Sequence, residues 1–105
     1  MSIITRLSRT GKYEKIEFVL KLVDRILAGD DIFDDRVLLM DTIEEMYRIL
    51  RQLALNSKDE NLLTAFEKMA ILRHSLQREN VFDRKTLSDI KPVLLNTLKE
   101  RSGSL

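Results

Sequence analysis

Hydrophobic residues recur at intervals of three and four along most of this chain, which is the spacing of one face of an α-helix. Four such stretches predict four helices, over residues 13–28, 34–55, 57–78 and 83–101. No run of useful length alternates with the period of two that a half-buried strand requires. The chain has only 3 Gly and 1 Pro, so few residues interrupt these stretches. The pattern therefore predicts an all-α protein.

The second stretch carries the widest apolar arc. Its hydrophobic residues alternate at spacings of four and three, as along the seam of a coiled coil, and further apolar residues widen that seam. We therefore expect the helix over 34–55 to be the central helix of the fold. The seam consists of Leu39, Ile43, Met46, Leu50 and Leu53, and it is widened by Tyr47, Ile49 and Ala54.

The same three-residue pattern, an aliphatic residue followed by phenylalanine and aspartate, precedes the second and the fourth stretch. It occurs as Ile32-Phe33-Asp34 and as Val81-Phe82-Asp83. Aspartate is a good N-cap because its carboxylate accepts a hydrogen bond from a free N–H group of the first helical turn. We predict that Asp34 and Asp83 are caps, and that each phenylalanine forms a hydrophobic staple with a leucine at the fourth helical position. The two leucines are Leu38 and Leu87.

The remaining helix boundaries follow from single residues. Gly29 is expected to end the first helix. Ser57, or alternatively Asp59, caps the third helix. Pro92 lies too deep in the fourth helix to be a first-turn proline, so we expect a kink or break near Ser88–Asp89.

A chain of 105 residues can form one hydrophobic core. The predicted architecture is a single domain over residues 1–105, a mostly antiparallel four-helix bundle of two helical hairpins. Residues 1–12 are expected to form a basic N-terminal arm or short helix, and residues 102–105 a frayed tail. Sliding the chain by 49 residues superposes Phe33 on Phe82. We interpret this match as two hairpins built by the same capping rules rather than as a duplication.

The sequence contains no cysteine, which excludes disulfides, thiolate metal sites and a cysteine nucleophile. This composition fits a reducing compartment, and we expect a cytoplasmic protein. No apolar run approaches the roughly 20 residues that a membrane-spanning helix needs, so no membrane association is predicted. Residues 1–12 are basic, lack acidic residues and contain several Ser and Thr, as an organellar presequence does. We favour an ordinary N-terminal arm, with a presequence as the alternative.

The net charge of +1 gives the chain no overall attraction for nucleic acid. The charges are nevertheless segregated, since residues 29–47 hold one basic and seven acidic residues. Four of the acids flank the first corner as adjacent pairs, not at the alternating positions of a calcium loop, so we expect no metal there. We expect instead that the corner attracts a basic segment of a partner. These acids are Asp30, Asp31, Asp34 and Asp35.

Residues with catalytic potential are few. His74 is the only histidine, and it lies away from the apolar stripe of the third helix, where we expect it to be exposed. Arg73 lies within that stripe and is expected to pair with an acid or to extend to solvent within the fold. No common catalytic, phosphate-binding or metal-binding motif is present. We therefore predict that the protein is not an enzyme and needs no cofactor.

Phe18 and Leu22 are the strongest functional signal. They are four residues apart and lie away from the apolar stripe of the first helix, so they form one contiguous patch. Bases surround the patch, as expected of a protein-binding site with a charged rim. The alternative is that Ile3, Ile4 and Leu7 of the N-terminal arm cover the pair. The surrounding bases are Lys15, Lys21 and Arg25.

From these features we predict a non-enzymatic protein–protein interaction module, a small helical adaptor or accessory subunit of a larger assembly. The expected partner is another protein or a second copy of the chain. The predicted partner-binding residues are Phe18, Leu22, Lys15, Arg25, Asp30 and Asp31. The alternative is a helical nucleic-acid-binding protein or regulator that uses its basic N-terminal half, with at most weak binding. Clustered bases on one face would favour the alternative, and an apolar patch rimmed by charge would favour a protein partner.

Overall fold

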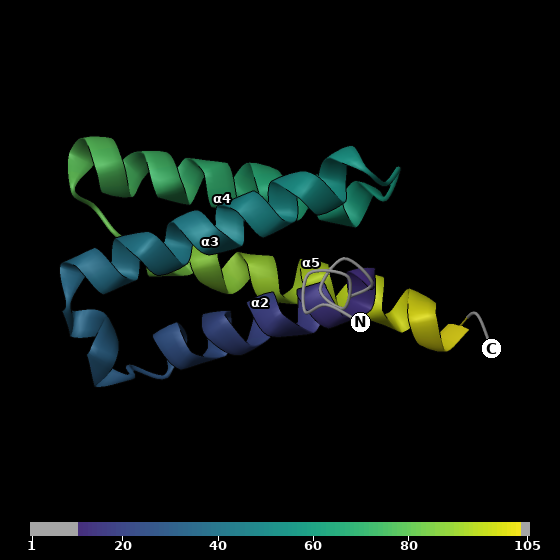
Figure 1. The fold of residues 1–105 in the computed structure, drawn as a ribbon, viewed down its shortest axis with the longest axis horizontal. Helices are drawn as coiled ribbons and strands as arrows, with labels where there is room; N and C mark the ends of the chain where they lie inside the picture. Colours follow the sequence, from purple (N-terminus) through teal and green to yellow (C-terminus); the bar gives the residue numbers. More distant parts are fainter. Residues whose placement is uncertain (1–10, 104–105) are drawn as a thin grey trace, which may run out of the picture.

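A computed structural model describes residues 11–103, with side chains described up to residue 100. Over these residues the chain forms four long helices, and no strand is present among them. The helices run antiparallel to their neighbours in sequence (Figure 1), so the predicted all-α four-helix bundle is confirmed. The elements of the described residues are α2 (Lys12–Leu27), the 3-10 turn η1 (Asp31–Asp34), α3 (Arg36–Leu55), α4 (Glu60–Glu79) and α5 (Arg84–Gly103).

The described residues include only parts of the two terminal segments that the sequence predicted. Of the arm predicted for residues 1–12, residues 1–10 lie outside the described part of the chain. Lys12 is already the first residue of α2. The frayed tail proposed from residue 102 is wrong at its start, because α5 continues to Gly103. Residues 104–105 lie outside the described part of the chain.

The helices are arranged as a ring rather than around a central member. α3 packs against α4, α4 against α5, α5 against α2, and α2 against α3, which is the least extensive of the four contacts. The expectation that α3 is central is therefore wrong. Its wide apolar arc is only partly covered, and Val37 and Leu55 at its two ends are exposed.

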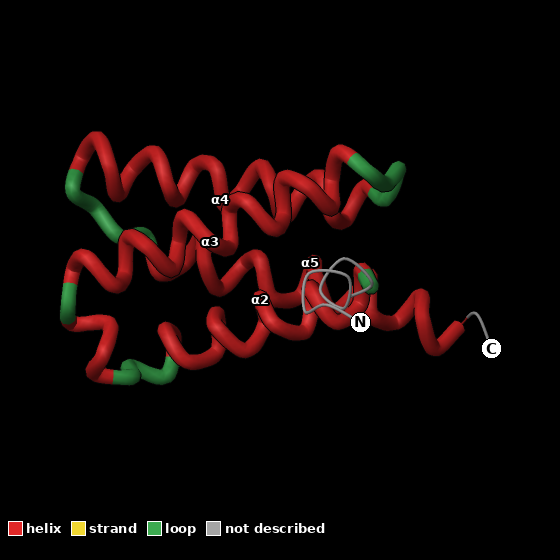
Figure 2. The backbone as a smooth tube through the Cα atoms, in the orientation of Figure 1, coloured by secondary structure: helices red, strands yellow, loops and turns green. Residues whose placement is uncertain are grey.

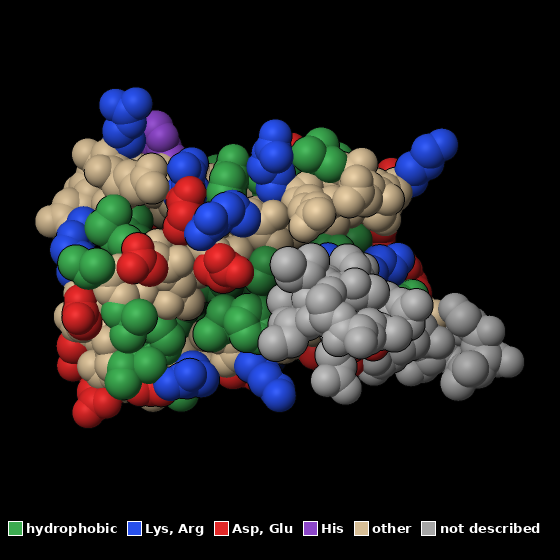
Figure 3. Space-filling view, viewed as in Figure 1, with side chains coloured by type: hydrophobic (Ala, Val, Ile, Leu, Met, Phe, Trp, Pro, Cys, Tyr) green, Lys and Arg blue, Asp and Glu red, His purple; other side chains and the backbone are tan. Residues whose placement is uncertain are grey.

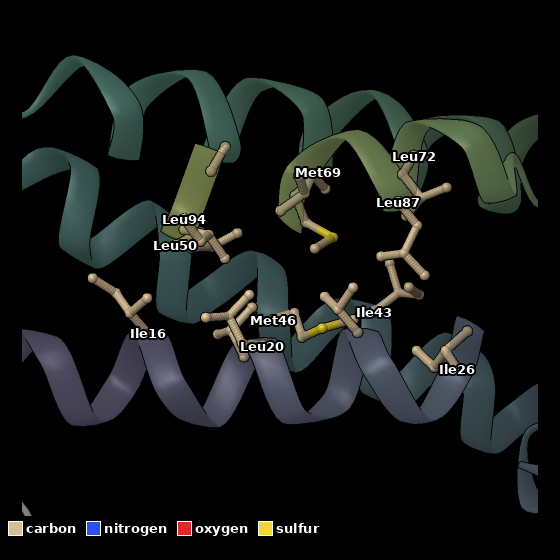
Figure 4. Packing of buried hydrophobic residues seen from close by; sticks show 14 of the residues in the cluster. Ile16, Leu20, Ile26, Ile43, Met46, Leu50, Met69, Leu72, Leu87 and Leu94 are labelled. Carbon is tan, nitrogen blue, oxygen red and sulfur yellow. The ribbon is translucent and has the colours of Figure 1, made fainter. Parts of the chain in front are cut away.

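The core lies along the axis of this ring and takes one stripe from each helix (Figure 4). The predicted seam of α3 is confirmed at four positions, while Leu39 is only partly buried. Each stripe repeats at three and four residues, so every helix turns one face to the axis and leaves its polar face in water. The largest fully buried side chains include Ile16, Met46, Leu50, Met69, Leu72, Leu87 and Leu94.

The first corner differs from its prediction by one residue. Asp35, not Asp34, caps α3, and its carboxylate accepts hydrogen bonds from the N–H groups of Val37 at 2.9 Å and Leu38 at 3.3 Å. The shift arises because Asp30 caps a 3-10 turn, accepting from the Ile32 N–H at 3.2 Å, and this turn uses the residues up to Asp34.

The shifted cap also moves the predicted hydrophobic staple. With Asp35 as N-cap, the fourth helical position is Leu39, which packs against the core. Leu38, the predicted partner of Phe33, is 38% exposed. A one-residue change of register on a helix turns a side chain by about 100°, which is enough to take it off the core face.

The second corner agrees with its prediction. Asp83 caps α5, accepting from the N–H groups of Lys85 at 3.1 Å and Thr86 at 3.2 Å, and Leu87 is fully buried. The hydroxyl of Thr86 also donates to the Asp83 carboxylate at 2.9 Å, and this hydrogen bond is the main reason that the pKa of Asp83 lies below its ordinary value.

Two other boundary predictions are corrected. Asp59 caps α4, accepting from the Asn61 N–H at 2.8 Å, whereas Ser57 accepts from the N–H of Asp59 itself at 3.1 Å. The break predicted near Ser88–Asp89 is absent, because α5 is one continuous helix from Arg84 to Gly103. Leu87 and Leu94, buried on either side of the proline, hold both halves of α5 against the core. Gly29 does end α2, with a φ of 80° that favours glycine.

Candidate protein-binding surface

The two flanks of α2 face different neighbours. Asp24 forms an ion pair of 2.7 Å with Lys91 of α5, so the flank that carries Asp24 faces α5. Successive helical residues turn by about 100°, which places Leu22 on the opposite flank, toward α3, and Phe18 on the outer side of α2 next to that flank. The sequence showed that these residues avoid the core stripe, and the ion pair shows that they lie on the side of α2 that turns away from α5.

α3 presents a matching flank. Glu44 pairs with Arg73, and the Tyr47 ring lies 5.4 Å from the ring of Phe66, so this flank of α3 faces α4. Leu38 and Ile49 lie on the other flank, toward α2. Leu38 is exposed and Ile49 is half-buried against the core.

These two flanks form one surface, which we call the α2–α3 face: Phe18 and Leu22 from α2, with Leu38 and Ile49 from α3. Figure 3 shows hydrophobic side chains gathered over α2 and the adjoining edge of α3, with acidic side chains toward α3 and basic ones along the outer edge of α2. Of the four helix contacts in the ring, the one between α2 and α3 is the least extensive. An apolar surface with a rim of both charges is the arrangement expected of a protein-binding site.

The central residues of the predicted patch differ in exposure. Phe18 is 48% exposed, whereas Leu22 is half-buried and packs against the core. Lys15 is half-buried beside them, and Lys21 is exposed. The alternative cover by residues 3–7 lies outside the described residues.

Arg25 and Asp30, both predicted to bind a partner, bind each other. The Arg25 guanidinium donates to one carboxylate oxygen of Asp30 from Nε at 2.9 Å and from Nη2 at 2.7 Å. This hydrogen bonding holds the pKa of Asp30 below its ordinary value. The same guanidinium lies 5.7 Å from the centre of the Phe33 ring. The two residues therefore stabilise the first corner, and Asp31 remains exposed beside them.

A pocket of about 220 Å³ opens where the two corners meet. The α2–α3 and α4–α5 connections lie at the same end of the bundle (Figure 2). The pocket brings together Phe33 and Phe82, which no local sequence pattern placed side by side. The signal that could have predicted this was the repeated corner pattern, because the two corners of an antiparallel bundle of two hairpins lie at the same end. The pocket is lined by Ile26, Gly29, Asp30, Phe33, Asp34, Leu39, Phe82 and Arg84.

Arg73 is accounted for within the fold, as predicted. Its guanidinium binds both carboxylate oxygens of Glu44, one of them from Nη2 at 3.1 Å, and lies 4.4 Å from the centre of the Tyr47 ring. The hydrogen bond from Arg73 lowers the pKa of Glu44, and the carboxylate in turn raises the pKa of Arg73. This cluster joins α3 to α4 and leaves no free charge for chemistry.

Other candidate chemistry is sparse in the part of the chain that the structure describes. His74 is exposed, as predicted. Within residues 11–103 no group of three or more His, Asp or Glu side chains is placed to hold a metal ion. No helix in the same range has the length and apolar character needed to cross a membrane.

No protein-family model, curated protein or solved structure matches this chain.

Proposed function

We propose that this protein is a non-enzymatic interaction module, a small helical adaptor or accessory subunit, and that its partner protein docks on the α2–α3 face. The observation that carries the proposal is the position of Phe18, a large aromatic residue that is 48% exposed on the outer side of α2, next to the helix pair with the least extensive contact. Aromatic residues at the centre of an interface often contribute a disproportionate share of the binding energy.

The surroundings of Phe18 support docking rather than incidental exposure. Leu22 and Ile49 are partly buried and pack against the core, so the core holds this part of the face in place. A partner that covers Phe18 and Leu38 would remove both from water without moving the helices. Full burial of such a side chain contributes roughly 1.5–3 kcal/mol. Because Phe18 is 48% exposed, covering it would contribute about half of that free energy to a complex.

Several of the described basic residues already have partners within the fold, which reduces the positive charge available to nucleic acid. Arg25 and Arg73 are bound to carboxylates, and Lys91 is paired with Asp24. Arg36 and Arg84 donate to backbone carbonyl groups. A phosphate-binding surface needs bases that are free to replace counterions. We propose that the protein acts in a reducing compartment such as the cytoplasm, in keeping with its lack of cysteine.

Phe18→Asp tests this proposal, with Leu63→Asp as the matched control. Leu63 is 49% exposed on α4, away from the α2–α3 face. Tagged full-length proteins would be used to capture partners from an extract of the source cells, with and without nuclease, and thermal melts would report folding. We expect nuclease-resistant capture by the wild type and by Leu63→Asp, and at least tenfold less by a folded Phe18→Asp.

Two outcomes would reject the proposal. Capture that disappears with nuclease would favour the nucleic-acid alternative. A Phe18→Asp variant that is destabilised but captures its partner normally would show that the residue belongs to the fold. Light scattering of the same variants measures their molar mass and so distinguishes self-association from binding of a different protein. If a second copy binds this face, the wild type should have a larger molar mass than Phe18→Asp.

A further inference from the structure

The pocket at the joined corners has an apolar base and a polar opening. Ile26, Leu39 and the two corner phenylalanines supply the apolar lining, from four separate segments of the chain. Each of these residues packs against the core or belongs to it, so the lining is preformed. A preformed pocket costs little ordering free energy when it is filled.

The volume of the pocket limits what it can hold. Ligand sites for drug-sized molecules occupy about 300–1,000 Å³, whereas an apolar cavity of about 150 Å³ holds a single benzene ring. At about 220 Å³ this pocket fits one aliphatic or aromatic side chain and is too small for a nucleotide or a larger cofactor.

The charges at the opening select a cation beside that side chain. Arg84 lines the pocket and donates from its guanidinium to the Leu27 carbonyl at 2.7 Å, but this neutral acceptor leaves the positive charge of Arg84 in place. Asp30 is bound by Arg25. Asp34 lines the opening and Asp31 is exposed beside it, and neither forms an ion pair with another described residue. Counting the carboxylates of Asp30, Asp31 and Asp34 against the guanidinium groups of Arg25 and Arg84, these side chains carry a net charge of −1.

We propose that this pocket binds one aliphatic or aromatic side chain of a basic peptide segment in a partner protein, with a Lys or Arg next to that side chain pairing with Asp34. The inference stands apart from the α2–α3 face, because it uses other residues and does not require Phe18. Opposite charges across such a contact would speed association and fix the direction of the bound segment.

Three short peptides test the proposal on the full chain: acetyl-Lys-Leu-Arg-amide, its charge-reversed form acetyl-Glu-Leu-Glu-amide, and acetyl-Lys-Gly-Arg-amide, which lacks the anchor. Nitrogen–proton correlation spectra would be recorded as each peptide is added. We expect saturable shifts at the amides of Gly29, Phe33 and Phe82 with the first peptide. Binding of each of the other two should be at least threefold weaker.

Two variants separate the charge from the pocket. Asp34→Asn should weaken binding of the first peptide about two- to fivefold, the range expected for one exposed ion pair. Asp41→Asn, an exposed acid on α3, is the control and should change nothing. Leu39→Phe narrows the pocket and should weaken the first peptide while leaving acetyl-Lys-Gly-Arg-amide unchanged; if this variant does not fold, the comparison of those two peptides on the wild type still tests the pocket.

Equal binding of the three peptides, or shifts confined to residues outside the pocket, would overturn the proposal. Shifts at Gly29 and Phe82 that follow protein concentration without peptide would identify a second copy as the occupant and would also overturn it. Phe18→Asp should leave peptide binding unchanged. Failure of this inference can therefore be told from failure of the proposed α2–α3 docking face.

Discussion

Arg84, the first residue of α5, donates a hydrogen bond of 2.7 Å to the backbone carbonyl of Leu27, the last residue of α2. The reciprocal contact is present in the other hairpin, where Arg36, the first residue of α3, donates to the Leu76 carbonyl at 3.3 Å. In each case an arginine directly after an aspartate N-cap reaches the C-terminal turn of a helix in the other hairpin. These carbonyls have no partner within their own helix, and a cation there also complements the helix dipole.

Replacing Arg84 with Met should lower the free energy of unfolding by about 1 kcal/mol, because it removes the guanidinium hydrogen bonds and keeps the aliphatic stem. Chemical denaturation monitored by circular dichroism measures the change. Arg51→Met, at an exposed position of α3, is the matched control and should be nearly neutral. Equal stability of the two variants would show that the contact between hairpins contributes nothing.

Asp35→Ala should destabilise the protein by about 1 kcal/mol, since two N–H groups of α3 lose their acceptor. Asp34→Ala should change stability by less than about 0.5 kcal/mol, because Asp34 is exposed at the end of η1. The two variants differ by one position in the chain, and thermal melts separate them. If Asp34→Ala lowered the melting temperature more than Asp35→Ala, Asp34 would be the cap of α3.

The Glu44–Arg73 pair should make the free energy of unfolding depend on pH. Its hydrogen bond lowers the pKa of Glu44 in the folded state below the ordinary value of 4.5, so the folded state binds fewer protons than the unfolded state over that interval. The pair therefore stabilises the protein fully above pH 4.5, and the contribution is lost as the pH falls through the lowered pKa. Denaturation curves of wild type and Glu44→Gln should converge as the pH is lowered.

Glu45→Gln is the control for that experiment. Glu45 pairs with Arg48 at 3.3 Å, but both side chains are at least half exposed, and such surface pairs contribute little. We expect its pH profile to follow that of the wild type. A Glu44→Gln profile that stays parallel to the wild type throughout would contradict the role assigned to the pair.

Pro92→Ala should raise stability by about 1–3 kcal/mol. The proline lies inside a continuous α5 with an exposed side chain, so alanine restores a helical N–H donor without disturbing the core. Asn96→Ala, also exposed and one turn further on, reports the gain from helix propensity alone and should be about 0.5 kcal/mol. A Pro92→Ala variant that is less stable than the wild type would mean that the packing of α5 requires the proline.

The sequence by itself determined the helices, their core faces and the antiparallel hairpin plan. Apolar spacing is a local property that does not depend on neighbouring elements, and the buried residues of α2 through α5 follow it. The sequence also predicted the cap at Asp83 correctly, because no 3-10 turn before it shifts the start of α5.

The tertiary structure decided the rest. The first corner shifted from Asp34 to Asp35 because the 3-10 turn capped by Asp30 competes with the helix start. α5 continues through Pro92 because the core holds its two halves, and α3 is not central because each helix of the ring has two neighbours. The pocket between Phe33 and Phe82 and the contact from Arg84 to Leu27 join residues about 50 positions apart, which no local pattern specifies and only the packing of the two hairpins creates.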